Sequence, residues 1–437
     1  MKHRNGLVRE MAVGILLLLI MATGSTCSPT ALPMTTEAAS TATCTPTSAW
    51  LPAMTPTMEL CLTMTETPSG MSDTPTVLPT TTPILAPLPT PVVADDRIHL
   101  DQYTVFYSTT SKGEDTITVE IWRVRLDGSD KTLLFRDIRQ RWAIGTPSPG
   151  PWGERRFSLG DLTLSPDRTK LAFTYVAARK GSTDQPDNSI WVMNVDGSEL
   201  RELARLNYLG SPSWSPDGSK LFFRGYGGRL FWADVANGYI TDMGEGGATS
   251  WSPDGQRLAV AIWQGDSVEE PGIYISSLYG WRYLIWPTTK APSEGEYPTV
   301  SQVAWSPDGQ KIAFDLSFLL ESPAGGTRAG CFTISPEGDD LEMIAGGLCS
   351  DLQWSPDSKR LSFSLSNDAE HAWILYVAKP GGEPMPIQKH SLEHKWSSDG
   401  KAILSCVEGE SGNFAFFVEE GVMIKIPIEG LGCSFAW

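Results

Sequence analysis

Short apolar segments alternate with polar turns from about residue 98 to the end of the chain, and six of them follow one pattern. An apolar segment ends in Trp or Leu, Ser-Pro-Asp-Gly or a close variant follows, and a second apolar segment begins. The copies read LTLSPDRTKLAF, SWSPDGSKLFF, SWSPDGQRLAV, AWSPDGQKIAF, QWSPDSKRLSF and KWSSDGKAILS. Pro at the second position and Gly at the fourth are typical of a tight turn. The pattern therefore predicts repeated β-hairpins.

Two further strands follow each hairpin around a second Gly-containing turn, as in IWVMNVDGSELREL. Measured at the last apolar residue before the turn, from Leu164 to Trp437, successive copies are 37 to 54 residues apart. Four antiparallel strands in a repeat of this size are typical of a propeller blade.

The two ends of the repeat region complement each other. YTVFYS at 103–108 and IWRVRLDGSDKTLLF at 121–135 supply the second, third and fourth strands of a blade, and no Ser-Pro-Asp-Gly turn precedes them. LGCSFAW at 431–437 is the first strand of a repeat. We therefore predict an all-β fold, a seven-bladed β-propeller over residues 98–437 that the C-terminal strand closes by pairing with the first blade. Closure removes exposed strand edges.

These residues resemble the TolB-like, WD-repeat-like propeller repeat of bacterial exported proteins and lipoproteins. The resemblance covers residues 98–437, and the departures at Arg168, Ser358 and Ser398 fall within the turn. It implies the propeller fold. Relatives include periplasmic binding scaffolds, the propeller halves of prolyl-oligopeptidase-like hydrolases and sugar-acting lyases, so the resemblance does not fix an activity.

The N-terminal region has a different composition. Lys2, Arg4 and Arg9 precede MAVGILLLLIMA, which is too short to span a bilayer comfortably and is typical of an export signal. We predict a signal peptide over residues 1–26, and its resemblance to lipoprotein signals implies lipidation at Cys27. Ordinary cleavage after Ala22 or Gly24, or an uncleaved anchor, are the alternatives. Each outcome places the protein outside the cytoplasm, membrane-anchored or secreted.

Residues 27–97 read as a disordered Thr/Pro-rich linker. Between Ser28 and Ala94 there are 18 Thr and 12 Pro. Such a segment cannot bury enough apolar surface to offset its chain entropy. We interpret it as a stalk that needs no fold of its own.

The charge balance restricts the class of partner. The chain has 34 Lys and Arg against 51 Asp and Glu, a formal net charge of −17. This argues against nucleic acid or an anionic lipid surface, both of which need a basic footprint. We expect membrane contact only through a lipid or N-terminal anchor, and we expect a monomer.

The repeat region has no Gly-x-Ser-x-Gly nucleophile elbow. The segment from His390 to His394 spells the His-x-x-Glu-His zinc motif, but that site needs a helix and this segment lies between strands. We therefore predict no metal, no cofactor and no catalytic residue. The recurrent aspartates are interpreted as turn residues; they are Asp167, Asp217, Asp254, Asp308, Asp357 and Asp399. The Trp residues before the turns are interpreted as core.

Six cysteines remain if Cys27 is lipidated. The sequence-local candidates for disulfides in the propeller are Cys331 with Cys349 and Cys406 with Cys433. Free buried thiols are the alternative, because connectivity cannot be deduced from one sequence.

The long connections of the repeat all belong to the class that opens on one face of an up-and-down propeller. On a rigid scaffold, such loops usually carry binding. One connection has a basic and aromatic cluster suited to an anionic glycan or an acidic peptide; its residues are Arg139, Arg141, Trp142, Trp152, Arg155 and Arg156. The alternative is that these arginines pair with neighbouring carboxylates.

The predicted function is a non-catalytic extracytoplasmic binding scaffold for a cell-envelope protein, peptide or glycan. The competing hypothesis is a carbohydrate- or peptide-acting enzyme whose active residues are gathered from several blades. Carboxylates clustered around the central channel would favour the enzyme.

Overall fold

The computed structural model describes residues 87–140, 157–177, 187–206, 209–262, 270–279, 282–288, 298–318, 329–367, 372–407, 412–428, 431 and 433–437. The predicted signal peptide, Cys27 and most of the predicted linker lie outside these residues. Within the described ranges, no helix has the length and apolar character needed to cross a bilayer.

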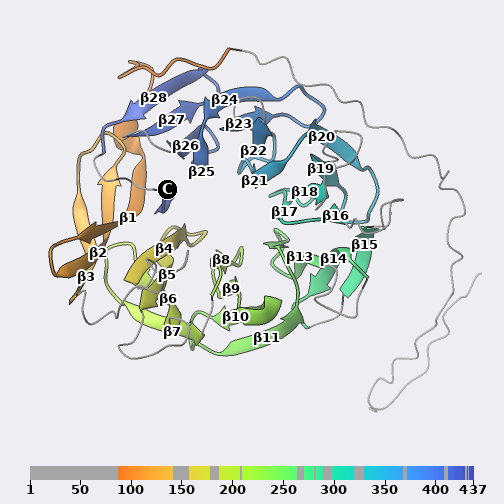
Figure 1. Ribbon diagram of the computed structural model, residues 1–437, viewed down its shortest axis with the longest axis horizontal. Coiled ribbons are helices and arrows are strands. Elements are labelled where there is room, and N and C mark those ends of the chain that lie inside the picture. Colours follow the sequence, from red (N-terminus) through yellow and green to blue (C-terminus); the bar gives the residue numbers. More distant parts are fainter. Residues whose placement is uncertain are drawn as a thin grey trace, which may run out of the picture. The chain divides into compact units, whose positions relative to one another are not determined.

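Seven antiparallel sheets stand side by side in a ring, one for each predicted blade (Figure 1). Blade 2 consists of β4 (Phe157–Leu164), β5 (Lys170–Ala177), β6 (Asp187–Asn194) and β7 (Arg201–Leu206). Blade 3 consists of β8 (Ser213–Trp214), β9 (Lys220–Arg224), β10 (Arg229–Asp234) and β11 (Ile240–Glu245). Blade 4 consists of β12 (Thr249–Trp251), β13 (Arg257–Ile262), β14 (Gly272–Ser277) and β15 (Arg282–Pro287).

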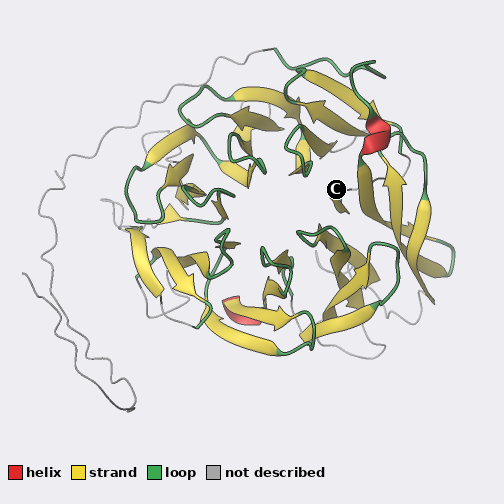
Figure 2. Cartoon of the chain, turned by 180° about the vertical axis from the view of Figure 1, so that it is seen from behind, coloured by secondary structure: helices red, strands yellow, loops and turns green. Residues whose placement is uncertain are grey.

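The remaining blades follow the same order. Blade 5 has an interrupted inner strand, β16 (Pro298–Thr299) and β17 (Val303–Trp305), followed by β18 (Ile312–Phe318), β19 (Gly330–Ile334) and β20 (Glu342–Gly346). Blade 6 consists of β21 (Cys349–Trp354), β22 (Leu361–Asn367), β23 (Ala372–Ala378) and β24 (Met385–Lys389). Blade 7 consists of β25 (Ser391–Trp396), β26 (Ala402–Val407), β27 (Asn413–Phe417) and β28 (Val422–Ile426). The only described helices are two single turns, Leu100–Gln102 and Tyr226–Gly228, which appear red in Figure 2.

Blade 1 is built from both ends of the repeat region, as the sequence predicts. Its inner strand β29 (Phe435–Ala436) pairs with β1 (Thr104–Lys112), and β2 (Thr116–Arg125) and β3 (Thr132–Gln140) complete the sheet. The register places Tyr107 opposite Phe435. The prediction of seven blades closed by the C-terminal strand is therefore confirmed.

Hydrophobic clusters lie between neighbouring blades, and the tryptophans that end the inner strands belong to them. These indoles are 6–9% exposed, and four of them also donate a hydrogen bond to the preceding blade. The indole nitrogens of Trp214, Trp354, Trp396 and Trp437 donate to the carbonyls of Thr163, Ala304, Gln353 and Lys395, at 3.2, 3.0, 3.3 and 3.0 Å. Each acceptor is the residue just before the last residue of the preceding inner strand. Trp437 thus makes the contact that its counterparts make.

The Ser-Pro-Asp-Gly turns form a second ring on one face, which we call the turn face. Each turn contacts the one before it: a β-carbon added to Gly218 would lie 3.8 Å from Pro166, and one added to Gly400 would lie 3.6 Å from Pro356. At Ser358, the side-chain oxygen instead accepts a hydrogen bond from the Asp308 amide, at 2.9 Å. The second-to-third-strand connections and the links between blades open on the opposite face, the loop face.

The boundary between blades 7 and 1, which we call the seam, carries additional links. Cys406 and Cys433 form a disulfide with their α-carbons 5.4 Å apart. Val92 lies beside β28, exchanging backbone hydrogen bonds with Met423 (2.8 Å) and Lys425 (3.1 Å). The sequence analysis ends the linker at residue 97, yet this part of it is bound to the outer edge of blade 7. Covering that edge protects the unpaired groups of an outer strand.

Candidate functional site

Two inner strands carry an aspartate on a β-bulge at the centre of the ring. The pairing of β4 with β5 shifts between Gly160 and Thr163, and the pairing of β21 with β22 shifts between Ser350 and Gln353. Asp161 and Asp351 occupy these bulges with φ of 51° and 54°. Bulges often re-aim side chains beside functional sites. We therefore built the candidate site outward from these aspartates.

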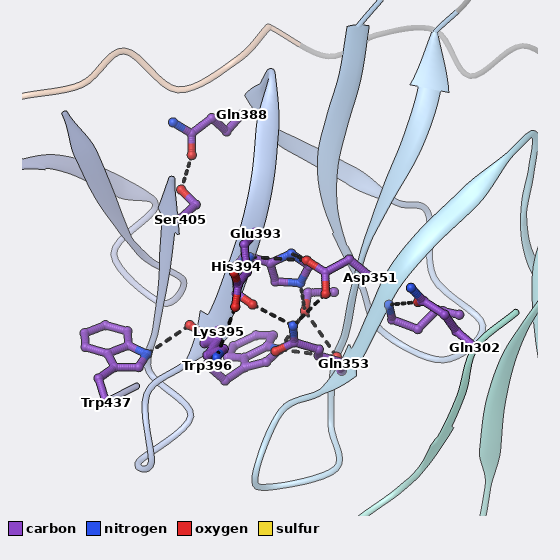
Figure 3. A network of polar contacts seen from close by, with 12 residues as sticks. Gln302, Asp351, Gln353, Gln388, Glu393, His394, Lys395, Trp396, Ser405 and Trp437 are labelled. Carbon is purple, nitrogen blue, oxygen red and sulfur yellow. Dashed lines mark hydrogen bonds and ion pairs between the residues drawn. The ribbon is translucent and has the colours of Figure 1, made fainter. Parts of the chain in front are cut away.

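Asp351 begins a hydrogen-bonded relay that joins blades 6 and 7 (Figure 3). Its carboxylate lies 2.6 Å from His394 Nδ1, and His394 Nε2 lies 2.7 Å from Ser362 Oγ. The Ser362 oxygen in turn accepts from Trp396 Nε1 at 2.8 Å. The order carboxylate, imidazole, hydroxyl is that of a catalytic triad.

The imidazole and the hydroxyl of this relay are buried, whereas the Asp351 side chain is 29% exposed. Ser362 and His394 are both 0% exposed, so a substrate carbonyl has no route to the hydroxyl. A nucleophile must be within reach of the bond it attacks. Neighbouring side chains also engage two members of the relay, because Gln353 donates to Asp351 and Trp396 donates to Ser362. We therefore interpret Asp351, His394 and Ser362 as a buried tie between two blades.

The relay also fixes the charge state of its acid. Burial raises the pKa of Asp351, but the charge of His394 and its hydrogen bonds, with one from Gln353, outweigh that effect. The pKa of Asp351 is consequently lowered, and the group remains a carboxylate at neutral pH. Gln353 donates to Asp351 at 2.9 Å and to the His394 carbonyl at 2.6 Å, which adds a further link between β21 and β25.

Lys395 and Glu393 form the second half of the central network. Lys395 Nζ donates to the carbonyls of Leu162 (3.2 Å) and Phe435 (2.7 Å) and lies 3.1 Å from a Glu393 carboxylate oxygen. One ammonium group thus connects blades 7, 1 and 2. Burial raises the pKa of Glu393 against the opposing effect of Lys395, and the charges of Asp351 and Asp161 add to the increase. The centre of the ring therefore holds three carboxylates and one ammonium group.

The sequence analysis missed this network. It weighed His390 and His394 only as the two ends of a zinc motif, whereas His394 lies on strand β25 and its partners come from blade 6. No group of three or more metal-ligating side chains gathers anywhere in the described part of the chain. The signal available in the sequence was a run of polar residues, Glu393-His394-Lys395, on a strand that faces the ring centre.

Arg139 is the described member of the predicted binding cluster. It lies on β3 rather than in a loop, because β3 continues to Gln140 by pairing with the start of β2. Its guanidinium lies 5.3 Å from the Phe157 ring centre and 5.8 Å from that of Tyr175. It also donates to the Tyr175 hydroxyl (2.8 Å) and to Asp137 (3.2 Å).

The same contacts affect Tyr175. Burial is the main reason that the pKa of Tyr175 is raised, and its hydrogen bond to Asp137 (2.5 Å) adds to the effect. Arg139 therefore stands on an aromatic platform at the loop face, with one carboxylate beside it. The other five predicted residues, Arg141, Trp142, Trp152, Arg155 and Arg156, lie outside the described residues.

The disulfide candidates are both present. Cys331 on β19 is joined to Cys349 on β21, with α-carbons 5.7 Å apart, and this bond links blades 5 and 6. Cys406 is joined to Cys433 across the seam. Both bonds therefore connect neighbouring blades.

Comparison with known proteins gives weak structural similarity. Neither the family models nor the curated proteins include a match. Similar solved structures include an oligogalacturonate lyase in complex with manganese (13% identity over 73% of this chain and 84% of that chain, TM-score 0.47). Another is an oligogalacturonate lyase from Vibrio parahaemolyticus (12% identity over 74% of this chain and 85% of that chain, TM-score 0.47). A third is a chain from a study of two prolyl endopeptidases (15% identity over 75% of this chain and 51% of that chain, TM-score 0.47). A putative TolB from Agrobacterium tumefaciens matches over 56% of this chain (14% identity, 82% of that chain, TM-score 0.32). At these identities we transfer no activity.

Proposed function

We propose that the protein is a non-catalytic binding scaffold that acts outside the cytoplasm and recognises a protein, peptide or glycan through its loop face. The observation that carries this proposal is that the His394 imidazole, the Ser362 hydroxyl and the Lys395 ammonium group at the ring centre are already engaged by neighbouring blades. Among the described residues, the imidazole and hydroxyl of the triad-like relay are buried, and the Lys395 ammonium group is bound by two carbonyls and a carboxylate. These groups hold neighbouring blades together. We therefore place ligand recognition in the connections at the periphery of the ring.

The placement of the connections supports the loop face. The links from β3 to β4 and from β18 to β19 contain 16 and 10 residues outside the described ranges, and both open on this face. By contrast, each Ser-Pro-Asp-Gly turn joins its two strands within a few residues. The aromatic platform under Arg139 stands at the start of the longest link. Stacking and ion pairing there suit an anionic or aromatic ligand.

The test compares variants of the two faces. Arg141, Trp142, Arg155 and Arg156 are replaced together by Ala or Ser, and the matched control carries Gln256→Ala and Gln310→Ala on the turn face. Binding of solubilised envelope components from the producing cell is measured by interferometry. We expect the loop-face variant to lose at least about tenfold in affinity, or 1.4 kcal/mol. Equal loss in both variants, or loss in the control alone, would contradict the choice of face.

A second function is favoured by one observation. Glu393 has a raised pKa and stands near two other carboxylates, an arrangement in which one acid can hold a proton and donate it to a leaving group. This would suit an enzyme acting on a carbohydrate or peptide. Hydrolysis or elimination on a panel of oligosaccharides and peptides that disappears in Glu393→Gln, while the variant keeps its fold, would favour the enzyme over the scaffold.

A further inference from the structure

The ring of turns is incomplete at blade 1. The inner strand of that blade is β29 and its second strand is β1, and these come from opposite ends of the repeat region, so no turn of the repeat joins them. The neighbouring turns are those of blade 7, residues 397–400, and blade 2, residues 165–168. Elsewhere, the fourth residue of one turn contacts the second or third residue of the turn before it. Because blade 1 has no such turn, the corresponding contact must run directly from the turn of blade 2 to the turn of blade 7.

Two departures from the repeat flank this position. The fourth residue of the blade 2 turn is Arg168 where the repeat favours Gly, and the second residue of the blade 7 turn is Ser398 where it favours Pro. An Arg168 guanidinium nitrogen donates to Ser398 Oγ across the position of the missing turn. Arg168 has φ of 60°, a backbone conformation that costs a residue other than Gly roughly 1–2 kcal/mol. The side chain therefore offsets a strain that Gly would not have.

Clefts lie on both sides of this bridge. One of about 390 Å³ is lined by residues of blades 1 and 2, and one of about 200 Å³ by residues of blades 7 and 1. Thr104 and Arg168 line both. Asp399 lines the smaller cleft, where Ser397, the Lys401 amide and the Tyr103 hydroxyl already bind its carboxylate.

The basic side chains of these clefts have fewer ion-pair and hydrogen-bond partners than those of a similar cleft between blades 2 and 3. In that cleft, Lys170 pairs with Glu199 at 3.7 Å and Arg201 donates to the Val235 carbonyl. In the cleft between blades 1 and 2, Arg125 pairs with Asp130, but among the described residues neither Arg123 nor Arg168 has a carboxylate within ion-pair distance. Hydrogen bonds from Ser198 and, to a smaller extent, the charge of Arg123 lower the pKa of Asp196. Although the chain has 17 excess negative charges, this concave surface therefore carries two guanidinium groups that could pair with an added carboxylate.

We propose that this surface binds an acidic tight turn of a partner protein, which occupies the position of the missing turn and presents a carboxylate to Arg168 and Arg123. The six turns of the chain's own repeat show the backbone shape that fits between neighbours on this face. Charge-assisted hydrogen bonds from guanidinium groups to a carboxylate are stronger than the present bond to a neutral hydroxyl. An incoming carboxylate therefore displaces Ser398 as the partner of Arg168. This site is separate from the loop face and does not depend on the function proposed for it.

The probe is a cyclic hexapeptide that presents Ser-Pro-Asp-Gly, and its control has Asn in place of Asp. Binding to the whole protein is measured by calorimetry and by NMR of the arginine side chains. We expect the Asp peptide to bind saturably at least tenfold more tightly than the Asn peptide, and the difference to shrink at high salt. No saturable binding, equal binding of the two peptides, or binding of a uronic-acid oligosaccharide in place of the peptide would overturn the proposal.

Three variants locate the site. Arg168→Gly restores the repeat residue and relieves the backbone strain, so we expect a folded protein that binds the Asp peptide at least tenfold less tightly. Ser398→Pro releases Arg168, and we expect binding at least as tight as in the original protein. Lys359→Ala removes one positive charge from the turn face at blade 6 and should leave binding unchanged. Undiminished binding in Arg168→Gly, or an equal loss in Lys359→Ala, would contradict the assignment.

Discussion

At the residue scale, the tryptophan that ends an inner strand has two roles. Its ring fills the space between blades, and in four blades its indole nitrogen donates to the preceding inner strand. Trp437 also lies 5.6 Å from the Tyr103 ring, centre to centre, within the cluster at the seam. The composition of the repeat predicted the packing, but the hydrogen bond depends on how two blades are placed.

Replacing Trp437 tests both roles. We expect Trp437→Ala to lower the free energy of unfolding by about 3–5 kcal/mol, the range for deleting a large aromatic side chain from a core. Trp437→Phe keeps most of the packing and removes the hydrogen bond, so a smaller loss is expected, of which the bond supplies about 1 kcal/mol. Urea denaturation measures both. A Trp437→Ala protein with the original midpoint would contradict the closure of the ring by this residue.

The central carboxylates predict a dependence of stability on pH. The pKa of Glu393 is raised in the folded protein, so folding favours its protonated form. Its contribution to stability is therefore greatest below its unfolded pKa of about 4.5 and is lost as pH rises through the folded value. Glu393→Gln lacks this titration. The stability of the variant relative to the original should increase with pH above 4.5 and then become constant, and a difference independent of pH would contradict the assignment.

At the element scale, the Ser-Pro-Asp-Gly turn stabilises itself through its own side chains. In blade 3, Ser215 Oγ donates to Asp217 (2.6 Å) and accepts from the Lys220 amide (2.9 Å), while Asp217 accepts from the Ser219 amide (3.0 Å). Gly218 supplies the positive φ of 70° that the turn needs. The interpretation of the recurrent aspartates as turn residues agrees with these contacts.

Ser215→Ala tests the turn. The hydrogen bond from Ser215 is the largest cause of the lowered pKa of Asp217, about 2, so that pKa should move upward in the variant. The lost hydroxyl should also cost about 1–2 kcal/mol, because it removes the acceptor of the partly buried Lys220 amide. Carboxyl titration by NMR and urea denaturation check the two effects. An unchanged Asp217 titration would show that the serine does not hold the turn.

Local sequence predicts the strands and turns of this fold, but it does not predict the bulges or the candidate site. Strands, turns and the split first blade follow from repeated patterns of five to ten residues. The bulges at Asp161 and Asp351 do not, because a register shift is decided by the partner strand as well as by the bulged one. The candidate site was missed for the same reason, since Asp351, Ser362 and His394 lie on three strands of two blades.

At the scale of the whole molecule, reinforcement is concentrated at the seam. The disulfide between Cys406 and Cys433 joins blades 7 and 1, Val92 pairs with the outer strand of blade 7, and the bridge from Arg168 to Ser398 passes blade 1 to join blades 2 and 7. In addition, the Tyr103 hydroxyl donates to Asp399 at 3.2 Å, and burial together with Asp399 raises the pKa of Tyr103 to about 12. In the other six blades the chain joins the inner strand to the second strand, whereas in blade 1 β29 is held beside β1 only by contacts between distant segments.

Removing each disulfide should show this difference. Cys406 and Cys433 are 27 positions apart, and Cys331 and Cys349 are 18 apart. The chain-entropy model then gives similar stabilisation for the two bonds, about 3–4 kcal/mol each. We expect Cys406→Ala with Cys433→Ala to aggregate on heating, because it frees the edge of β1, whereas Cys331→Ala with Cys349→Ala unfolds without aggregating. Light scattering during a thermal ramp distinguishes them, and identical traces would contradict a special role of the seam.

The division of blade 1 between the two ends of the repeat region also means that this blade can be completed only late in synthesis. Tyr103 and Asp399 meet although they are 296 positions apart, and β29 follows later still. At about 5–20 residues per second, a ribosome needs roughly 15–60 s to make that length of chain. Throughout this interval β1 has no inner neighbour, so the nascent protein exposes an unpaired strand edge until β29 has been made. A chain interrupted anywhere before residue 435 lacks β29 and leaves that edge open.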